Sequence, residues 1–158
     1  MYAAVSRRLA VLIAVLAALA SAVGLLWRAL YRDNAFVLTA WNGNDAITLI
    51  VAVPLMAAAL WFARRGSSRA LLIVFGLLDY MLYNYAFYLF AARFNALFLV
   101  YVALVAGSMF ALLFGLVDLD AAAMASRFDD RTPRRLIGGY MLLVGIGLTV
   151  VYVMQSAV

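Results

Sequence analysis

Apolar residues fill five runs along the chain, and the short stretches between the runs hold most of the charged side chains. The runs cover approximately residues 9–27, 46–63, 70–91, 96–117 and 136–154. A helix needs about 20 mainly apolar residues to cross the hydrocarbon of a bilayer. None of the runs alternates between apolar and polar residues, as a strand of a membrane barrel does. The pattern therefore predicts an all-α integral membrane bundle of five transmembrane helices, forming a single transmembrane domain over residues 1–158.

The first run also resembles a secretory signal peptide. Basic residues precede it, and Ala20-Ser21-Ala22 offers small side chains for cleavage. The apolar residues continue beyond this point to Trp27, so a retained helix is favoured.

Composition agrees with a membrane protein and excludes much chemistry. Of all residues 70% are hydrophobic and 12% are charged, whereas about a quarter of a soluble domain is charged. The chain contains no Cys, His, Lys or Glu, which excludes thiolate nucleophiles, imidazole bases, Schiff-base lysines and Cys/His metal sites. We therefore expect no enzymatic activity, no cofactor and no metal.

The distribution of arginine predicts the orientation of the chain. With five spans, one side of the membrane carries nine arginines and the other side three. Positive residues in short loops stay on the cytoplasmic side. The N-terminus is therefore predicted to be cytoplasmic and the C-terminus external. The nine are Arg7, Arg8, Arg64, Arg65, Arg69, Arg127, Arg131, Arg134 and Arg135, and the three are Arg28, Arg32 and Arg93.

One face of the third run is polar and aromatic. A charged carboxylate near mid-membrane costs several kcal/mol, so Asp79 is expected to face the bundle or a cavity rather than lipid. As a functional group it would relay protons or ions, or bind a polar ligand. As a structural group it would hydrogen-bond to a neighbouring helix. The opposite face, with Leu78, Met81, Leu82 and Leu89, is interpreted as the lipid-facing side. The candidates for a ligand site or proton relay are Asp79, Tyr80, Tyr83, Asn84 and Tyr88.

The loop between the first and second runs offers a second group of candidates on the external side. The apolar patch that ends at Trp41 is expected to lie in the membrane interface. Asn42-Gly43 is typical of a turn, and Asn44 or Asp45 is expected to cap the second helix. Capping and anchoring explain these residues as well as ligand binding does. The external polar candidates are Trp41, Asn44, Asp45 and Arg93.

Three further features have structural interpretations. Small residues recur every fourth position in the fourth run and allow close approach of helix backbones. Pro54 is expected to bend the second helix, because it leaves the carbonyl of Ile50 without its donor. Asp118-Leu119-Asp120 has the Asp-x-Asp form of metal-bound nucleotide sugar sites, but helix capping by Asp120 is favoured. The small residues are Ala103, Gly107, Ala111 and Gly115, with the same spacing at Ala20 and Gly24.

Several motifs together resemble a group of uncharacterised multi-pass membrane proteins from bacteria. They are Tyr83-Asn84-Tyr85-Ala86-Phe87-Tyr88, Arg93-Phe94-Asn95-Ala96-Leu97-Phe98, Gly43-Asn44-Asp45 and Arg131-Thr132-Pro133-Arg134-Arg135. The resemblance implies a location in the bacterial cytoplasmic (inner) membrane, and it implies no activity, substrate or cofactor.

The sequence favours a small non-enzymatic membrane protein that binds a partner protein, a lipid or a small ligand, as a subunit of a larger assembly. The alternative is a small transporter or ion-coupled carrier that uses Asp79. The expected partners are the bilayer with its anionic lipid headgroups, a second copy of the chain, or another membrane subunit. The basic charge is explained by topology and does not indicate nucleic acid.

Overall fold

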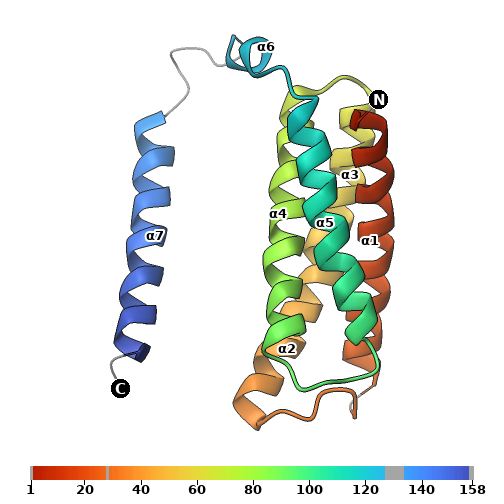
Figure 1. Ribbon diagram of the computed structural model, residues 1–158, viewed down its shortest axis with the longest axis vertical. Helices are drawn as coiled ribbons and strands as arrows, with labels where there is room; N and C mark the ends of the chain where they lie inside the picture. The colour runs from red at the N-terminus through yellow and green to blue at the C-terminus, as the bar shows by residue number, and fades with distance from the viewer. Residues whose placement is uncertain (1, 28, 127–133, 157–158) are drawn as a thin grey trace. The chain divides into compact units, whose positions relative to one another are not determined.

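The computed structural model describes residues 2–27, 29–126 and 134–156. All of the regular secondary structure in these residues is helical, and loops join the helices. They fall into two compact units, Met1–Leu119 and Asp120–Val158. Figure 1 shows the helices in chain order. They are α1 (Tyr2–Leu26), α2 (Ala35–Ile47), η1 (Thr48–Ala52), α3 (Val53–Arg64), α4 (Ser68–Phe90), α5 (Phe98–Val117), α6 (Ala121–Ala125) and α7 (Arg134–Ser156).

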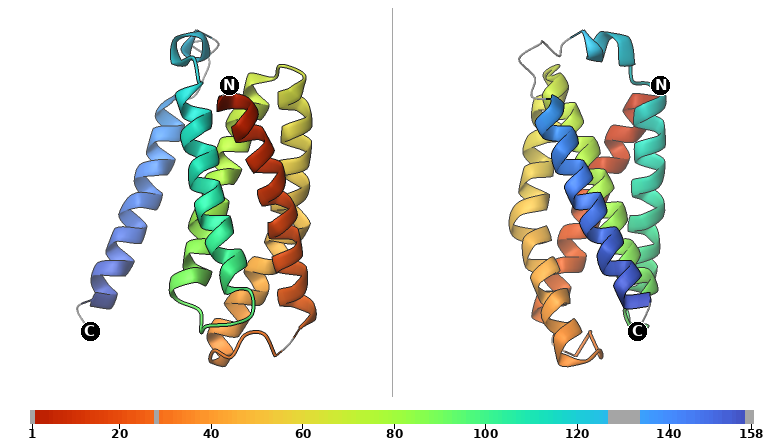
Figure 2. Two further views of the ribbon diagram at one scale, coloured as in Figure 1. Left: turned by 45° about the vertical axis from the view of Figure 1, so that its right-hand side comes forward. Right: turned by 90° about the vertical axis from the view of Figure 1, so that its left-hand side faces the viewer.

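The first unit is an up-and-down bundle in which α2, η1 and α3 form one continuous span. Around the bundle, α1 packs against α5, α5 against α4, α4 against α3, and α3 against α1 (Figures 1 and 2). Four helices are long and apolar enough to cross a membrane, as expected for an integral membrane protein. They are Ala4–Leu26, Ala35–Arg64, Ser68–Phe90 and Phe98–Val117. We call the end with residues 2–8 and the α3–α4 turn the N-terminal end, and the end with the loops 27–34 and 91–97 the far end.

The second unit contains α6 and α7. The predicted cap is confirmed, because Asp120 Oδ1 accepts a hydrogen bond from the backbone N–H of Ala123 at 2.9 Å. The short helix α6 that follows this cap ends at Ala125. The apolar stretch described in α7, Arg135–Gly147, is shorter than a span, so the fifth span stays a prediction.

The second predicted helix is much longer than its apolar run, and two local predictions at its start are wrong. It begins at Ala35, and Asn42-Gly43 lies inside α2 instead of forming a turn. Neither Asn44 nor Asp45 caps the helix, because Asn34 does so ten residues earlier. Asn and Gly are weak helix formers, but here they lie among residues that pack against α1, and such packing outweighs propensity.

Polar side chains accept hydrogen bonds from backbone amides at the starts of α2, α4 and α6 and in the turn before α5. A side-chain oxygen at the cap satisfies an N–H that has no partner within the helix. Asn95 forms a turn just before α5, which begins at Phe98. The acceptors and their donor amides are Asn34 and Val37 (3.0 Å), Ser67 and Ala70 (3.3 Å), Asn95 and Leu97 (2.9 Å), and Asp120 and Ala123 (2.9 Å).

The disturbance predicted at Pro54 takes the form of a π-helical segment. Proline has no N–H and its ring clashes with the carbonyl four residues back, at Ile50. Immediately before Pro54 the chain widens into η1, in which the N–H of Val53 donates to the carbonyl of Thr48, five residues earlier. A single π turn of this kind lets a helix continue past a position that would otherwise break its ladder.

Small residues let α5 approach its neighbours, although not along the whole predicted stripe. Ala111 and Gly115 are buried, Gly107 is half-buried and Ala103 is exposed. Next to this contact the hydroxyl of Ser6 on α1 donates to the carbonyl of Ala111 at 2.7 Å. This close approach joins the beginning of α1 to the end of α5.

We predict that Gly107→Leu lowers the free energy of unfolding by about 1–3 kcal/mol, because an inserted side chain must displace its neighbour. A methyl group at position 107 would already be in contact with Ile13, 3.4 Å from its Cγ1, so the larger leucine side chain must push against Ile13. Thermal unfolding in detergent, followed by circular dichroism, measures the effect. Leu113→Ala, at an exposed position of the same helix, is the control. Equal destabilisation by both variants would mean that Gly107 is not at a packing contact.

Candidate functional site

A buried carboxylate lies inside the first unit near its far end. Asp45 on α2 is 1% exposed. Its Oδ2 accepts a hydrogen bond from the hydroxyl of Tyr31 at 2.7 Å, and its Oδ1 accepts one from the hydroxyl of Tyr88 at 3.1 Å. Gly24 on α1 packs directly against Oδ2, where a Cβ atom would overlap both Asp45 and the Tyr31 hydroxyl. The carboxylate therefore accepts hydrogen bonds from two phenols and packs tightly against the backbone of α1 at Gly24.

Five aromatic rings pack around this carboxylate and are called here the aromatic cluster. Trp41 and Tyr88 have ring centroids 4.6 Å apart, and Tyr88 is also 5.2 Å from Tyr101. Tilted and offset ring pairs at these separations contribute about 0.5–1.5 kcal/mol each beyond their burial. All five rings are buried, so the site is tightly packed. The members are Tyr31, Trp41, Tyr85, Tyr88 and Tyr101.

Every span of the first unit contributes to this site. Tyr85 on α4 hydrogen-bonds to α1 twice, with its hydroxyl 3.3 Å from both Ser21 Oγ and the carbonyl of Ala17. One turn beyond Asp45, Thr48 Oγ1 and the hydroxyl of Tyr80 are 2.8 Å apart, which joins η1 to α4. Polar bonds between helices in a membrane are worth about 1 kcal/mol each and fix which faces meet.

Phenols, rather than a cation, hold the Asp45 carboxyl group. Among the described residues its hydrogen-bond donors are Tyr31 and Tyr88. Burial raises the pKa of the Tyr31 phenol above its ordinary value, and the bond to Asp45 raises it further, so Tyr31 remains a donor throughout the ordinary pH range. Tyr88 has one proton for two acceptors, since its hydroxyl is also 3.1 Å from the carbonyl of Trp41. Asp45 therefore competes for this proton.

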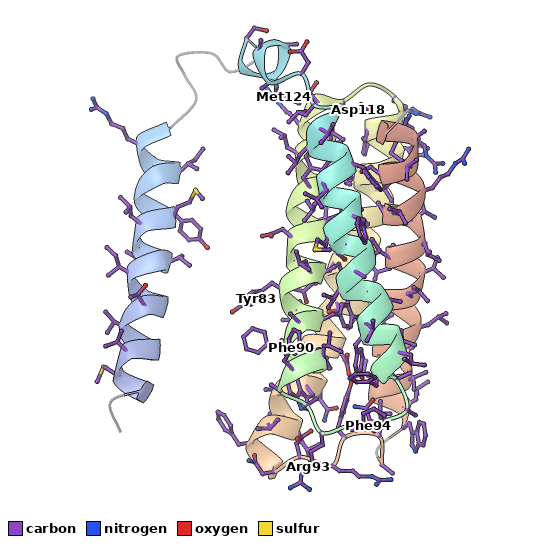
Figure 3. All side chains as sticks on the ribbon, in the orientation of Figure 1. Tyr83, Phe90, Arg93, Phe94, Asp118 and Met124 are labelled. Carbon is purple, nitrogen blue, oxygen red and sulfur yellow. The ribbon has the colours of Figure 1, made fainter. Side chains whose placement is uncertain are left out.

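Asp33 ties the two loops of the far end to the aromatic cluster. Its Oδ2 accepts a bond from the indole N–H of Trp41 at 3.2 Å. Its Oδ1 accepts one from the backbone N–H of Arg93, in the loop between α4 and α5, at 3.3 Å. Figure 3 shows Arg93 and its neighbour Phe94 in this loop. Asp33 therefore links the loop 27–34 both to α2 and to the loop 91–97 at the far end of the bundle.

Three buried polar atoms have no hydrogen-bond partner within the part of the chain that the structure describes. They are Asn84 Nδ2, the Tyr101 hydroxyl and Ser108 Oγ. A buried donor without a partner costs about 1–3 kcal/mol. Because Tyr101 belongs to the aromatic cluster, its hydroxyl is a hydrogen-bonding group of the site that the described residues leave unused.

The buried face of α4 takes residues from both predicted faces, since Asn84 and Tyr88 of the polar face are also buried. Leu78 and Met81, interpreted as lipid-facing, are fully buried in the core of the first unit. Asp79 and Tyr83 are exposed on that unit, and Figure 3 shows Tyr83 pointing away from α1 and α5. Inside a membrane, apolar side chains gain nothing by avoiding lipid, and packing decides which face turns inward. The first unit by itself therefore leaves Asp79 exposed, and its predicted contact with protein or a cavity stays a prediction.

The structure divides the predicted candidates differently from the sequence. Tyr88 was grouped with Asp79, but it contacts Asp45 from the external group. Trp41, expected at headgroup level, is 5% exposed because it packs against Tyr88 and bonds to Asp33. Of the remaining candidates, Tyr80 and Asn44 are half-buried, Asn84 is buried and Arg93 is exposed.

Sequence reasoning missed several contributors to the site, among them Tyr31, Asp33, Ser21 and Tyr101. Tyr31 and Asp33 stood in a loop with no periodic pattern to orient them, and Ser21 was one polar residue inside an apolar run. Gly24 had a signal, because it continues the small-residue spacing from Ala20. That spacing was interpreted as helix packing, and the structure shows that at Gly24 the group packed against it is a carboxylate.

A separate hollow of about 400 Å³ opens at the far end beside the loops. It lies between the residues that follow α1 and the start of α5, and its polar groups are those of Arg32 and Asn95. Its walls are mainly apolar, including Trp27, Phe94 and Phe98. Asp45 is not among the residues that line it, so the hollow and the buried carboxylate are different places.

No family model, no curated protein and no solved structure matches the chain. The chemistry of the site is therefore inferred from its residues. The buried carboxylate and phenols join four spans, and the described residues form no group that could hold a metal ion.

Proposed function

We propose that this protein is a non-enzymatic membrane subunit that binds a transmembrane helix of another protein through the Asp79 face of α4. We place it in the bacterial cytoplasmic membrane, with five spans, a cytoplasmic N-terminus and an external C-terminus. The arginine distribution supports this orientation.

The observation that carries the proposal is the contrast between the two aspartates within the spans. Asp45 is buried and has two phenol donors. Asp79 is exposed on the first unit, eleven residues after Ser68 and eleven before Phe90, at the centre of α4. A charged aspartate at the centre of a membrane helix costs about 2.5–3.5 kcal/mol. A partner that supplies a donor at this depth offsets that cost.

The neighbours of Asp79 suit a second helix. Gly76, one turn before Asp79, has nothing within 4 Å of the position its Cβ would occupy, so another backbone can approach closely there. One turn after Asp79, Tyr83 is 55% exposed and its ring packs edge-on against Phe87. In a symmetric pair of identical chains, two Asp79 carboxylates would face each other and repel. We therefore favour a different protein that presents a hydroxyl, an amide or a basic group.

A photo-reactive p-benzoylphenylalanine in place of Tyr83 tests this proposal in native membranes. We expect illumination to yield an adduct with one other membrane protein, because the probe replaces a ring on the proposed contact. Gel mobility and mass spectrometry of the adduct identify the protein. The same amino acid in place of Leu19, which is similarly exposed on α1, is the matched control and should give lipid adducts.

Two substitutions at Asp79 make the result specific. Asp79→Asn retains a side chain that can hydrogen-bond and should preserve the adduct. Asp79→Leu should remove most of it, since an apolar side chain offers the partner no bond. Equal protein adducts from positions 19 and 83, or lipid adducts alone from position 83, would contradict the proposal.

The carrier alternative uses the same residue but differs in one respect. Ion coupling needs a carboxyl group that releases a proton, so Asp79→Asn would abolish transport. Flux across proteoliposomes driven by a pH or sodium gradient distinguishes the two functions. The subunit proposal expects no gradient-driven flux in the wild type, and it expects Asp79→Asn to retain binding.

A further inference from the structure

Three arginines converge on one hollow at the N-terminal end of the first unit. Arg7 and Arg8 lie near the start of α1, and Arg64 ends α3. Together with Ala4 and Val11 they line a space of about 390 Å³. None of these lining residues is acidic. An anion placed in this space would be attracted by the positive charges of Arg8 and Arg64 from two helices.

The position of this hollow matches the headgroup level of a bilayer. Ala4 is the first residue of one candidate span and Arg64 the last residue of the next, so both spans reach the membrane surface here. The guanidinium of Arg65 lies 3.6 Å from the centre of the Trp61 ring, one turn into α3. Tryptophan is enriched at the interface between membrane and water. Two independent features thus place the arginines beside lipid phosphates.

We propose that this hollow, the arginine hollow, binds the phosphate of an anionic phospholipid. Guanidinium groups donate paired, charge-assisted hydrogen bonds to phosphate oxygens. Arg7, Arg8 and Arg64 approach from two helices and can hold one phosphate between α1 and α3. Val11 lies one turn deeper along α1 and provides an apolar wall against which an acyl chain can lie.

A lipid phosphate fits the arginine hollow better than free phosphate does. The same two helices expose apolar side chains within one turn of the lining arginines in sequence, such as Leu12 on α1 and Trp61 on α3. These side chains attract the acyl chains of a lipid and offer nothing to an inorganic anion. The same end is predicted to face the cytoplasm, where anionic lipids attract basic segments.

Native mass spectrometry of the purified full chain measures the binding directly. We compare phosphatidylglycerol with phosphatidylcholine of identical acyl chains, each added to the protein in mild detergent. The wild type should bind phosphatidylglycerol more tightly. Arg8→Gln and Arg64→Gln should each reduce that affinity about fivefold, the effect expected for one basic residue at an anionic surface. Arg69→Gln, at the same end but outside the hollow, should leave it unchanged.

Three results would overturn the proposal. Equal binding of the two lipids would remove the anion site. Equal affinity in wild type, Arg8→Gln and Arg64→Gln would place the lipid elsewhere. Displacement of phosphatidylglycerol by millimolar inorganic phosphate would assign the arginine hollow to a free anion instead of a lipid. Thermal unfolding of each variant checks that it folds like the wild type, as expected for substitutions at exposed positions.

Discussion

Asp45→Leu is expected to destabilise the protein more than any other substitution considered, by about 3–5 kcal/mol. Leucine removes the carboxylate that accepts from the Tyr31 and Tyr88 hydroxyls, and both phenols stay buried in the aromatic cluster. The two phenols belong to the loop after α1 and to α4, so the loss loosens three segments together. Thermal unfolding in detergent measures the effect, and in a background with Trp27 and Trp61 replaced by Phe the fluorescence of Trp41, packed on Tyr88, follows it locally.

Two variants serve as controls for this prediction. Asp45→Asn keeps one carbonyl acceptor for a phenol, so it should cost less than Asp45→Leu, about 1–3 kcal/mol. Asp79→Leu removes the other aspartate of the spans from an exposed position and should leave the unfolding midpoint nearly unchanged. If Asp45→Leu and Asp79→Leu unfold at the same temperature as the wild type, the Asp45 site does not stabilise the bundle.

Gly24→Ala should have the second largest effect, about 2–3 kcal/mol. The added methyl group would overlap Asp45 Oδ2 and the Tyr31 hydroxyl, so either α1 moves away from α2 or the hydrogen bond between Tyr31 and Asp45 breaks. The same unfolding experiment measures this loss.

The matched control for Gly24→Ala is Gly43→Ala. Gly43 lies within α2, and nothing is within 4 Å of the place its Cβ would take. Alanine is a better helix former than glycine, so this variant should be neutral or more stable by about 0.5–1 kcal/mol. Greater stability of Gly24→Ala than of the wild type would show that the close contact with Asp45 is not formed.

Most of the helices of the first unit could be predicted because the apolar runs are long. The runs predicted at 70–91 and 96–117 differ by two residues or fewer from α4 (Ser68–Phe90) and α5 (Phe98–Val117). Composition alone decides such segments, since a run of this length has few alternatives in a membrane. The start of α2 could not be predicted in this way. It depends on Asn34 as a cap and on the packing of Trp41 and Asp45, and neither is visible in a hydropathy pattern.

The orientation of α4 could not be derived from the polarity of its faces. In water, a polar face turns outward and an apolar face inward, and this contrast identifies the core. In a membrane both surroundings are apolar, so the fit of Leu78, Met81 and Tyr85 against neighbouring helices decides the inner face. Asp79 was correctly recognised as an unusual residue, but the carboxylate that the first unit buries is Asp45.

The two motifs nearest to the site meet in space although 43 positions separate their key residues. Asp45 closes Gly43-Asn44-Asp45, and Tyr88 closes the tyrosine-rich motif of α4. Each had been explained locally, one as a helix cap and the other as part of a relay face. The pairing depends on the approach of α2 to α4, and a single sequence holds no direct signal for such a contact.

The central claim, that Asp79 is satisfied by a partner and Asp45 within the chain, is tested most directly by the protein mass of the assembly in solution. Light scattering after mild extraction from native membranes gives the mass of protein in each complex. We predict a mass well above the 17.3 kDa of one chain for the wild type and for Asp79→Asn, and a mass of 17.3 kDa for a folded Asp79→Leu. A mass of 17.3 kDa for all three proteins, or an unchanged complex in Asp79→Leu, would contradict the account.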